Sequence, residues 1–457
     1  MQTEHPSAAI RPPSDVSAIT GLLGLAALTG WIMLCHFWPE IVRTFDLPSR
    51  AERLTGPNAA LMGLVVCAVP MVLWDVLVVK VHRRASTGID WDNPRKLADV
   101  VDVSITKLAG LWATWALIAA LYCLARWYWQ PPYLIAMQVL GAAIAPLFVL
   151  SIPYVLWLDR VLKEPRDACW HFGALLIGRE TCDREQVWIH LRAWAVKGFF
   201  TAFMITIVPG GFLHLVTPDW SNFLIMPGAL AFLLITFMFV IDEQIGTVGY
   251  ILTAKPLDAQ IRSANPYLAG WVAALACYPP FQLMEPGRPL FYLVDAGGQR
   301  GDDKWFELFA GQPVLLWGWG ALLVVLTAIY AWATMAFGIR FSNLTYRGVV
   351  TNGPYRFTRH PAYLSKNLFW WCAAMPFLVD PWSLTNSVRN TFFMGCVSAL
   401  YFWRAKTEER HLLAEDPKYR DYHAWMDQHG LITRRLNWLR NKASGRGTTQ
   451  GASTGSA

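Results

Sequence analysis

The sequence of 457 residues has little charge. Only 16% of its residues are charged, whereas a soluble domain carries about 25%. Hydrophobic residues make up 54% of the chain, and the mean hydropathy is +0.31. This balance argues against an ordinary soluble domain and indicates a membrane protein.

Several other features are missing. The eight cysteines form no Cys-x-x-Cys pair and show no Cys/His ligand spacing, so no metal site is indicated. Residues 1–15 lack the basic start and cleavage site of a signal peptide, so we expect the first membrane helix to direct insertion. The net charge of +7 is not gathered into a basic patch with interleaved aromatics. We therefore expect no nucleic-acid partner and interpret the charge as a topology signal.

The apolar residues come in runs of about 20, which is the length that a helix needs to cross a bilayer core. Many of the 24 Trp and 15 Tyr lie at the ends of these runs, as in interfacial aromatic belts. We predict an all-α, polytopic integral membrane protein in contact with the lipid bilayer. It has about ten spans, at 17–38, 58–80, 105–128, 133–158, 194–216, 222–241, 267–284, 313–337, 364–380 and 387–403.

One of these spans is weaker than the others. The run at 267–284 is short and contains Pro279 and Pro280. A re-entrant or broken helix is the alternative there, since non-helical backbone at membrane depth survives only when protein covers it.

Loop charges predict the orientation. With ten spans, both termini lie on one side, and that side receives most of the loop Lys and Arg. The opposite side keeps Arg43, Arg50, Arg53, Arg288, Arg300 and Lys304. The positive-inside rule then places both termini, residues 338–363 and the acidic pair Glu408-Glu409 in the cytoplasm. We expect a plasma or inner membrane.

A polar loop punctuated by Gly and Pro precedes the ninth predicted span. Residues 353–365 read Gly-Pro-Tyr-Arg-Phe-Thr-Arg-His-Pro-Ala-Tyr-Leu-Ser. Pro361 suits the first turn of a helix, and the free N–H groups of such a helix start favour an anion. Taken alone, Arg359-His360-Pro361 is better explained as an interface-anchored helix start. The upstream Gly353-Pro354-Tyr355 and the downstream acidic pair favour a cofactor site instead.

The acidic pair lies just beyond the last predicted span. Adjacent residues on a helix point about 100° apart, so Glu408 and Glu409 need not share a ligand. One could bind a cationic group while the other pairs with Arg404, Lys406 or Arg410. Taken alone, the pair is better explained as an ion-paired helix stem.

These elements together resemble the integral-membrane methyltransferases of the isoprenylcysteine carboxyl methyltransferase and phospholipid N-methyltransferase group. The shared pattern is Gly-Pro-Tyr, then Arg-His-Pro-x-Tyr, then Glu-Glu, with Tyr419-Arg420-Asp421-Tyr422 as its last element. Ser365 departs from it, since the family usually has Gly there. The resemblance covers roughly residues 338 to 430.

The resemblance implies S-adenosylmethionine as the cofactor. The residues that would bind it are Gly353, Tyr355, Arg359, His360, Pro361, Tyr363, Glu408 and Glu409. A weaker expectation for substrate contact falls on Arg340, Asn343, Arg356, Tyr419 and Tyr422. Tyr355 and Tyr363 could equally be interfacial anchors, and Tyr419 and Tyr422 could simply dock a helix. As a catalytic base, neither His360 nor His411 is compelling.

The predicted function is methyl transfer to a lipid-like or small hydrophobic acceptor through a carboxylate, amine or thiol. The alternatives are a transporter or scaffold that retains the motif, and a membrane reductase that uses NADPH. We divide the chain into 1–310, which we expect to govern acceptor choice or partner contacts, a methyltransferase-like unit at 311–440 and a disordered tail at 441–457. Asp75 lies within the second span, where a carboxylate marks function or a buried partner.

Overall fold

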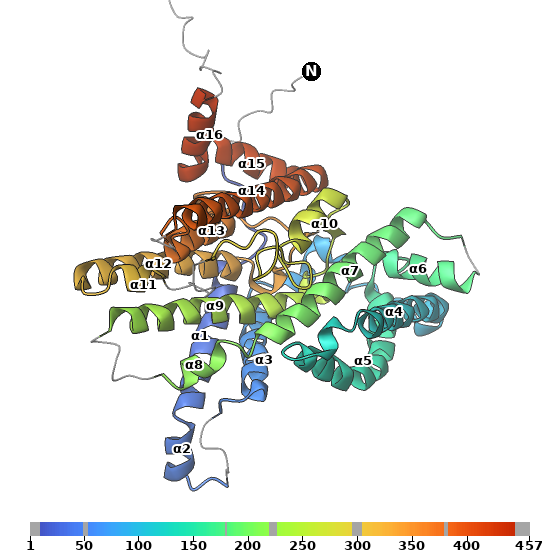
Figure 1. Ribbon diagram of the computed structural model, residues 1–457. Coiled ribbons are helices and arrows are strands. Elements are labelled where there is room, and N and C mark those ends of the chain that lie inside the picture. The colour runs from blue at the N-terminus through green and yellow to red at the C-terminus, as the bar shows by residue number, and fades with distance from the viewer. Residues whose placement is uncertain are drawn as a thin grey trace, which may run out of the picture.

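The structure is a computed structural model that describes residues 10–48, 54–178, 181–218, 226–294, 304–378 and 383–443. Most of the tail predicted to be disordered lies outside these ranges. Within these ranges the protein is helical, with one pair of short antiparallel strands in which Ser263 faces Tyr346 (Figure 1). The strands are β1 (Ser263–Ala264) and β2 (Thr345–Tyr346). The helices are α1 (Ala18–His36), α2 (Trp38–Thr44), α3 (Pro57–Leu73), α4 (Leu97–Ala125), α5 (Leu134–Val161), α6 (Ala168–Ile177), α7 (Arg184–Ile207), α8 (Phe212–Val216), α9 (Pro227–Ile251), α10 (Leu268–Leu275), α11 (Lys304–Leu308), α12 (Pro313–Met335), α13 (Pro361–Ala374), α14 (Leu384–Glu415), α15 (Pro417–His429) and α16 (Leu431–Ala443).

Seven helical segments in the described ranges are long and apolar enough to cross a membrane. They coincide with seven of the ten predicted spans and confirm an all-α polytopic membrane protein. The segments are Ala18–His36, Pro57–Val78, Leu97–Ala125, Leu134–Val161, Arg184–Val216, Pro227–Ile251 and Pro313–Met335.

The other three predicted spans do not meet these criteria, so the count of ten is not confirmed. Helix α13 has 14 residues, about 21 Å, which is shorter than a hydrocarbon core of about 30 Å. Helix α14 has 32 residues and is about 48 Å long, so its charged second half extends well beyond the predicted span at 387–403. Helix α10, in the weak seventh span, has only eight residues.

The packing of α9 against α12 shows what the seventh segment does. Ala231 lies against Gly320 near the start of both helices, and Asp242 accepts a hydrogen bond from Thr334 further along both. The two helices are therefore parallel, and the chain between them must return along their length. In the described part of that connection, the α-helices are only α10 and the five-residue α11, and one 3₁₀ turn spans Lys255–Leu257. A broken crossing is therefore favoured over a continuous helix.

Protein groups cover the irregular backbone of this connection. Leu283 donates to the carbonyl of Ala276, and Leu290 donates to the carbonyl of Leu283. The buried side chain of Asn390 on α14 bonds both the N–H and the carbonyl of Val294. Such pairing is what non-helical backbone requires within a membrane.

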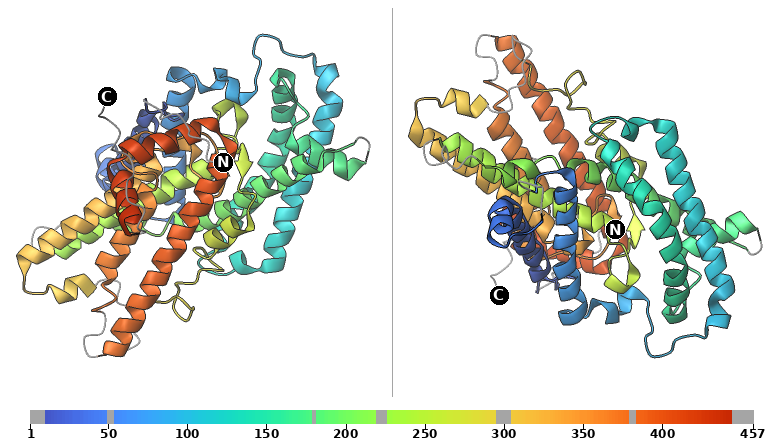
Figure 2. Two further views of the ribbon diagram at one scale, coloured as in Figure 1. Left: turned by 90° about the horizontal axis from the view of Figure 1, so that it is seen from above. Right: turned by 90° about the horizontal axis from the view of Figure 1, so that it is seen from below.

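The two ends of the described chain lie on one face of the bundle (Figures 1 and 2). The N–H of Asp15 donates to the carbonyl of Val349, which lies in the loop between α12 and α13, residues 336–360, called the motif loop below. Lys418 on α15 forms an ion pair with Asp15 at 2.6 Å. A shared face fits the predicted even number of crossings. The cytoplasmic assignment of that face stays a prediction.

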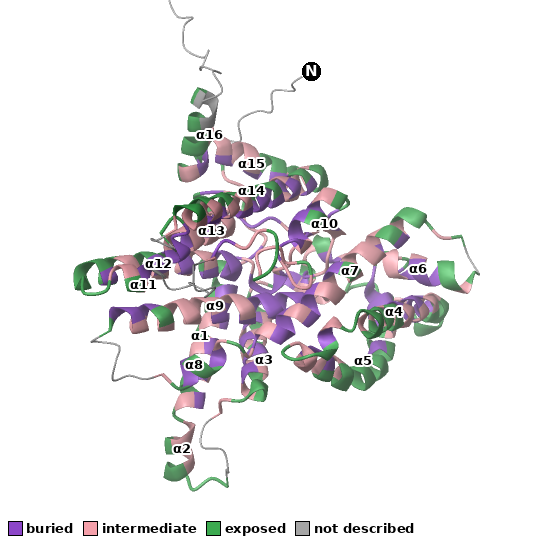
Figure 3. Ribbon diagram, in the orientation of Figure 1, coloured by how far each residue is buried: buried purple, intermediate pink, exposed green. Residues whose placement is uncertain are grey.

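The bundle buries its largest apolar cluster between α1, α3, α8, α9 and α12, and its fully buried members include Leu28, Met71, Phe212 and Ile245. Helices α4 and α5 stand to one side and expose many residues, drawn green in Figure 3. Much of this exposed surface is apolar, including Leu117, Leu121, Leu124, Ile144, Leu147 and Val149. Such a surface suits contact with lipid.

The intramembrane carboxylate noted in the sequence has a partner. Asp75 lies in a π-helical turn that continues α3, Trp74–Val78, and is buried. Thr20 on α1 donates its hydroxyl to Asp75. This contact accounts for the residue as a hydrogen bond between helices.

Candidate functional site

The loop from α12 to α13 is held in place by its glycine and proline residues. Gly353 has a φ of +56°, and a Cβ there would come within 3.1 Å of Nε1 of Trp332. Glycine therefore suits this position both in conformation and in space. Pro361 is the first residue of α13, and His360 caps that helix. Gly353 and Pro361 thus shape the loop rather than face a ligand.

Arg347 fixes the loop to the end of α9. Its buried guanidinium donates to the carbonyls of Gly249, Leu252, Ala259, Ile339 and Phe341. Burial lowers the pKa of Arg347 to about 9, and the charge of Arg340 acts in the same direction. Three of these five carbonyls, those of Gly249, Leu252 and Ala259, lie outside the C-terminal region.

Glu409 joins α14 to the start of α13. Its carboxylate lies 3.0 Å from Nε of Arg359 and 2.8 Å from Nε2 of His360, and it also pairs with Lys406. Burial acts to raise the pKa of Glu409, but the hydrogen bond from His360 and the charges of His360 and Arg359 outweigh it and hold that pKa well below its usual value. Glu409 is thus a buried clamp between two helices.

Glu408 faces a different way. The hydroxyl of Tyr363 and, at 3.4 Å, Nε of Arg404 both contact its Oε1 atom. The guanidinium of Arg404 lies 5.2 Å from the ring centre of Tyr363 and 5.3 Å from that of Tyr278. The buried Arg404 is therefore held between two aromatic rings and a carboxylate, which is a favourable setting for a cation.

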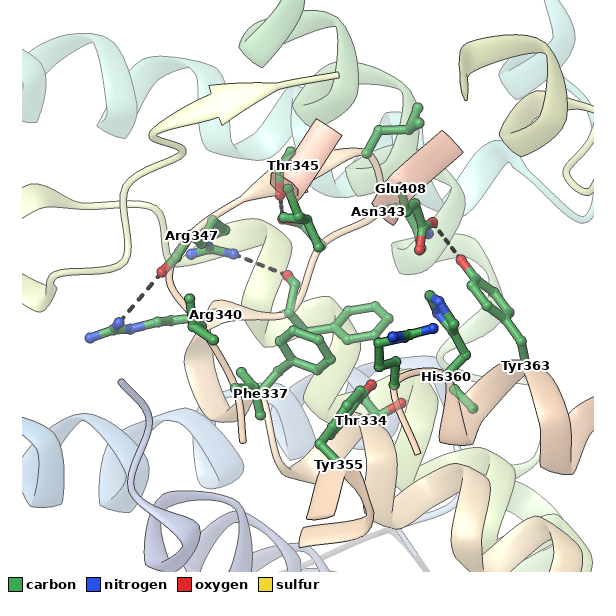
Figure 4. A pocket seen from close by; sticks show the side chains of 18 of the residues that line it. Thr334, Phe337, Arg340, Asn343, Thr345, Arg347, Tyr355, His360, Tyr363 and Glu408 are labelled. Carbon is green, nitrogen blue, oxygen red and sulfur yellow. Dashed lines mark hydrogen bonds between the residues drawn. The ribbon is translucent and has the colours of Figure 1, made fainter. Parts of the chain in front are cut away.

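These groups border a cavity of about 170 Å³. Figure 4 shows several of their side chains converging on it from the motif loop, α13 and α14. Nine of the residues predicted for the site line this cavity: Arg340, Asn343, Tyr355, Arg359, His360, Tyr363, Glu408, Tyr419 and Tyr422. Gly353, Pro361 and Glu409 do not line it, and neither does the exposed Arg356.

The residues expected to touch a substrate have partners of their own. Arg340 is buried and paired with Asp258 at 2.8 Å. Asn343 accepts from Arg404 at 2.7 Å and donates to the hydroxyl of Tyr278 at 3.0 Å. These contacts attach Arg340 and Asn343, in the cavity wall, to Asp258 and Tyr278.

The two tyrosines on α15 dock that helix. The hydroxyl of Tyr422 donates to the carbonyl of Tyr355 at 2.8 Å, and Tyr419 packs beside it. Both belong to a small cluster that also contains Tyr346, Val349 and Met426. This packing favours the docking alternative, although both rings also reach the cavity.

His411 also lines the cavity, close to α14's charged end. Burial lowers its pKa to about 4, and Arg192 acts in the same direction. Its Nε2 atom lies 2.9 Å from the hydroxyl of Ser263. A histidine with so low a pKa is neutral at pH 7 but a weak base, so His411 stays a poor candidate.

A second cavity, of about 290 Å³, adjoins the first. The two share the lining residues Tyr278, Tyr330, Phe341, Asn343, Lys366 and Tyr401. Its wall includes Asp242 and Glu243 from α9, which the sequence analysis did not consider. The sequence feature that could have identified Asp242 and Glu243 is their position as adjacent carboxylates within an apolar run. An ionisable residue in such a run is by default a hypothesis of a functional site.

A comparison with known protein families finds a match for the part of the chain that contains this site. Residues 319–414 match the isoprenylcysteine carboxyl methyltransferase (ICMT) family. The resemblance predicted for the C-terminal region is thereby confirmed. This ICMT segment contains the motif loop from Gly353, α13 and the acidic pair. No curated protein and no solved structure matches the chain.

The residues present suit a sulfonium donor with an amino-acid end. Glu408 offers a carboxylate at the cavity wall, and Arg359 and the start of α13 offer positive groups for a carboxylate. Tyr355 and Tyr363 offer aromatic faces. The wall thus combines charge of both signs with aromatic surface, as a zwitterionic donor requires.

Proposed function

We propose that the protein is an integral-membrane methyltransferase that uses S-adenosylmethionine and a lipid-like or small hydrophobic acceptor. The observation that supports this most directly is the cavity where Arg359, His360, Tyr363 and Glu408 meet inside the ICMT segment. Members of a methyltransferase family need such a place to hold donor and acceptor together.

In this proposal, the protein contributes position more than reactive groups. The donor supplies a methyl carbon that its positive sulfur has already activated. Glu408 binds the donor's ammonium group, and Arg359 and the N–H groups at the start of α13 bind its carboxylate. Holding the two reactants in line supplies several kcal/mol of the rate enhancement.

The clamp at Glu409 keeps these groups in place. It fixes Arg359 and His360 against α14, while Glu408, one residue earlier, stays at the cavity wall. The acceptor enters the first cavity from the second cavity, which is lined by residues of α9 and α12.

Donor binding is tested by calorimetry on the purified protein in lipid nanodiscs. We expect S-adenosylmethionine and its demethylated product to release heat that saturates with one site per chain. Empty nanodiscs are the control. If neither ligand binds at millimolar concentration and NADPH does, the chain is a reductase. If none of the three binds, the transporter or scaffold alternative is favoured.

A further inference from the structure

The second cavity is built mainly by the part of the chain outside the ICMT segment. Helix α9 contributes Asp242 and Glu243, and the irregular connection after α10 contributes Gln282 and Glu285. Lys366, on α13, is the basic residue in its lining. Three carboxylates against one ammonium group give this lining a formal charge of −2 when all are ionised.

The two carboxylates on α9 differ in their partners. Asp242 accepts hydrogen bonds from the hydroxyls of Tyr330 and Thr334. Glu243 has a buried Oε2 atom with no hydrogen-bond partner. In the described part of the chain, no ion pair joins either residue to a basic side chain, and Lys366 instead lies 5.0 Å from the ring centre of Tyr330. A buried carboxylate oxygen without a partner costs free energy, which a cationic ligand would recover.

The rest of the wall suits a cation on an apolar body. Its aromatic members include Phe203, Phe239, Tyr330, Phe341, Trp370 and Tyr401. Aromatic faces attract ammonium groups, and they do so more strongly when water is excluded. An acceptor that carries a carboxylate would instead meet three carboxyl groups, which repel it when they are ionised, and a neutral thiol would leave Glu243 without a partner.

We propose that the second cavity binds the acceptor and that the acceptor is an amine on an apolar molecule, held by Glu243 and Asp242. This inference rests on the proposed methyltransferase function, and it names the substrate class for the same site. Tyr278, Asn343 and Tyr401, which line both cavities, stand between the amine and the donor. The region before residue 310 would thus select the acceptor.

An amine must lose a proton before it can react. The ammonium group of the acceptor gives one proton to the carboxylate of Glu243, which becomes a neutral carboxylic acid. The nitrogen lone pair then forms a bond to the methyl carbon of the sulfonium donor. The carbon–sulfur bond breaks, and its electron pair stays on sulfur, so the products are a thioether and a methylated ammonium ion.

Three acceptors of equal length test this proposal without any variant: octylamine, octanoate and octanethiol. We expect methyl transfer from labelled S-adenosylmethionine to octylamine to exceed transfer to either other acceptor by at least about tenfold, the effect of one charge-assisted hydrogen bond. Octanoate or octanethiol as the preferred acceptor would overturn the proposal.

Two variants then test the residues. Glu243→Gln and Asp242→Asn should each lower kcat/KM for octylamine by about ten- to a hundredfold, while Glu164→Gln, at an exposed loop position, should not. Calorimetry with octylamine alone gives a readout that does not need turnover. Octylamine partitions into the nanodisc lipid to the same extent for the wild type and the variants. The difference in heat between the wild type and Glu243→Gln therefore measures octylamine binding at the second cavity.

Donor binding separates failure of this inference from failure of the proposed function. We expect both cavity variants to bind S-adenosylmethionine within about threefold of the wild type, because the residues proposed to bind the donor lie elsewhere. Normal donor binding with unchanged octylamine turnover in both variants would refute the amine site and leave the methyltransferase proposal standing. Absent donor binding in the wild type would refute both.

Discussion

Glu408 and Glu409 are neighbours in sequence but have different surroundings. Glu408 lies at the cavity wall with Tyr363 and Arg404, and Glu409 is buried among Arg359, His360 and Lys406. We expect Glu408→Gln to weaken donor binding by about ten- to a hundredfold, the effect of one lost charge-assisted hydrogen bond, with little change in melting temperature. Calorimetry and thermal unfolding in nanodiscs measure the two effects.

The matched variant Glu409→Gln should behave differently. It removes the charge that faces Arg359, Lys406 and the imidazole of His360, so we expect a lower melting temperature as the main effect. A buried ion pair that loses one partner costs about 3–5 kcal/mol. If Glu409→Gln instead abolishes donor binding at an unchanged melting temperature, the roles of the two glutamates are reversed.

The clamp at Glu409 also predicts a dependence on pH. Its pKa in the folded protein is depressed below the ordinary 4.5, so the folded state favours the charged form. The stability from this clamp is present above about pH 4.5 and is lost as the pH falls through the lower, folded pKa. The melting temperature of the wild type should therefore fall below pH 4.5 more steeply than that of Glu409→Gln. Equal slopes would show that the clamp contributes no net stability.

Sequence alone could indicate which residues are special but not what each one does. Pro361 at a helix start and Glu408-Glu409 after a span were recognisable because local rules apply to them. Glu408 faces the cavity and Glu409 pairs with Arg359, which lies in the loop before α13, and with Lys406 on α14. The role of Arg347 was hidden for the same reason, since its five carbonyl partners come from three separate segments.

At the scale of elements, close contact between helices depends on glycine. A Cβ at Gly21 on α1 would come within 2.2 Å of the carbonyl oxygen of Met335 on α12, whereas one at Gly30, also on α1, would meet nothing within 4 Å. Small residues allow membrane helices to approach in this way. We expect Gly21→Ala to lower the melting temperature clearly and Gly30→Ala to leave it unchanged or slightly higher.

Comparison of the two variants controls for helix propensity, because the same substitution is made in one helix. If Gly21→Ala and Gly30→Ala unfold at the same temperature, α1 and α12 do not need this close contact. Loss of the contact would also shift the motif loop, since residues 336–350 follow directly from α12.

The elements that were predictable are those with a uniform apolar run. Seven spans follow from hydropathy and length, since a helix in lipid must be apolar over its whole length. Helix α13 and the connection around α10 were harder, because protein contacts replace lipid there. Asn390, which bonds the backbone of Val294, lies on α14, more than ninety residues away. No local sequence pattern predicts such bonds.

At the scale of the whole molecule, the two halves of the sequence are not spatially separate. Val16 and Tyr278 line the first cavity beside residues of the ICMT segment, and α9 lies along α12. The division near residue 310 stays a prediction about roles. If the proposed amine site is correct, the acidic residues on α9 would place acceptor-binding groups in the first part and the proposed donor-binding groups in the second.

The orientation of the molecule in the membrane can be tested with two exposed positions. Arg288 lies in the irregular connection after α10, and Arg420 lies on α15. Loop charge predicts that α15 lies in the cytoplasm, and the parallel packing of α9 and α12 requires the chain between them to reach the opposite side. In a Cys123→Ser background, which removes an exposed native thiol, a membrane-impermeant maleimide should label Arg288→Cys in intact cells.

The companion variant, Arg420→Cys, should be labelled only after the cells are permeabilised. Each position then controls for the reactivity of the other. The reverse pattern would invert the orientation while leaving the fold intact. Labelling of both positions in intact cells would place the connection after α10 on the same side as α15. That result would contradict the crossing that the parallel helices require, and it would also place the donor cavity on the outer face, away from a cytoplasmic donor.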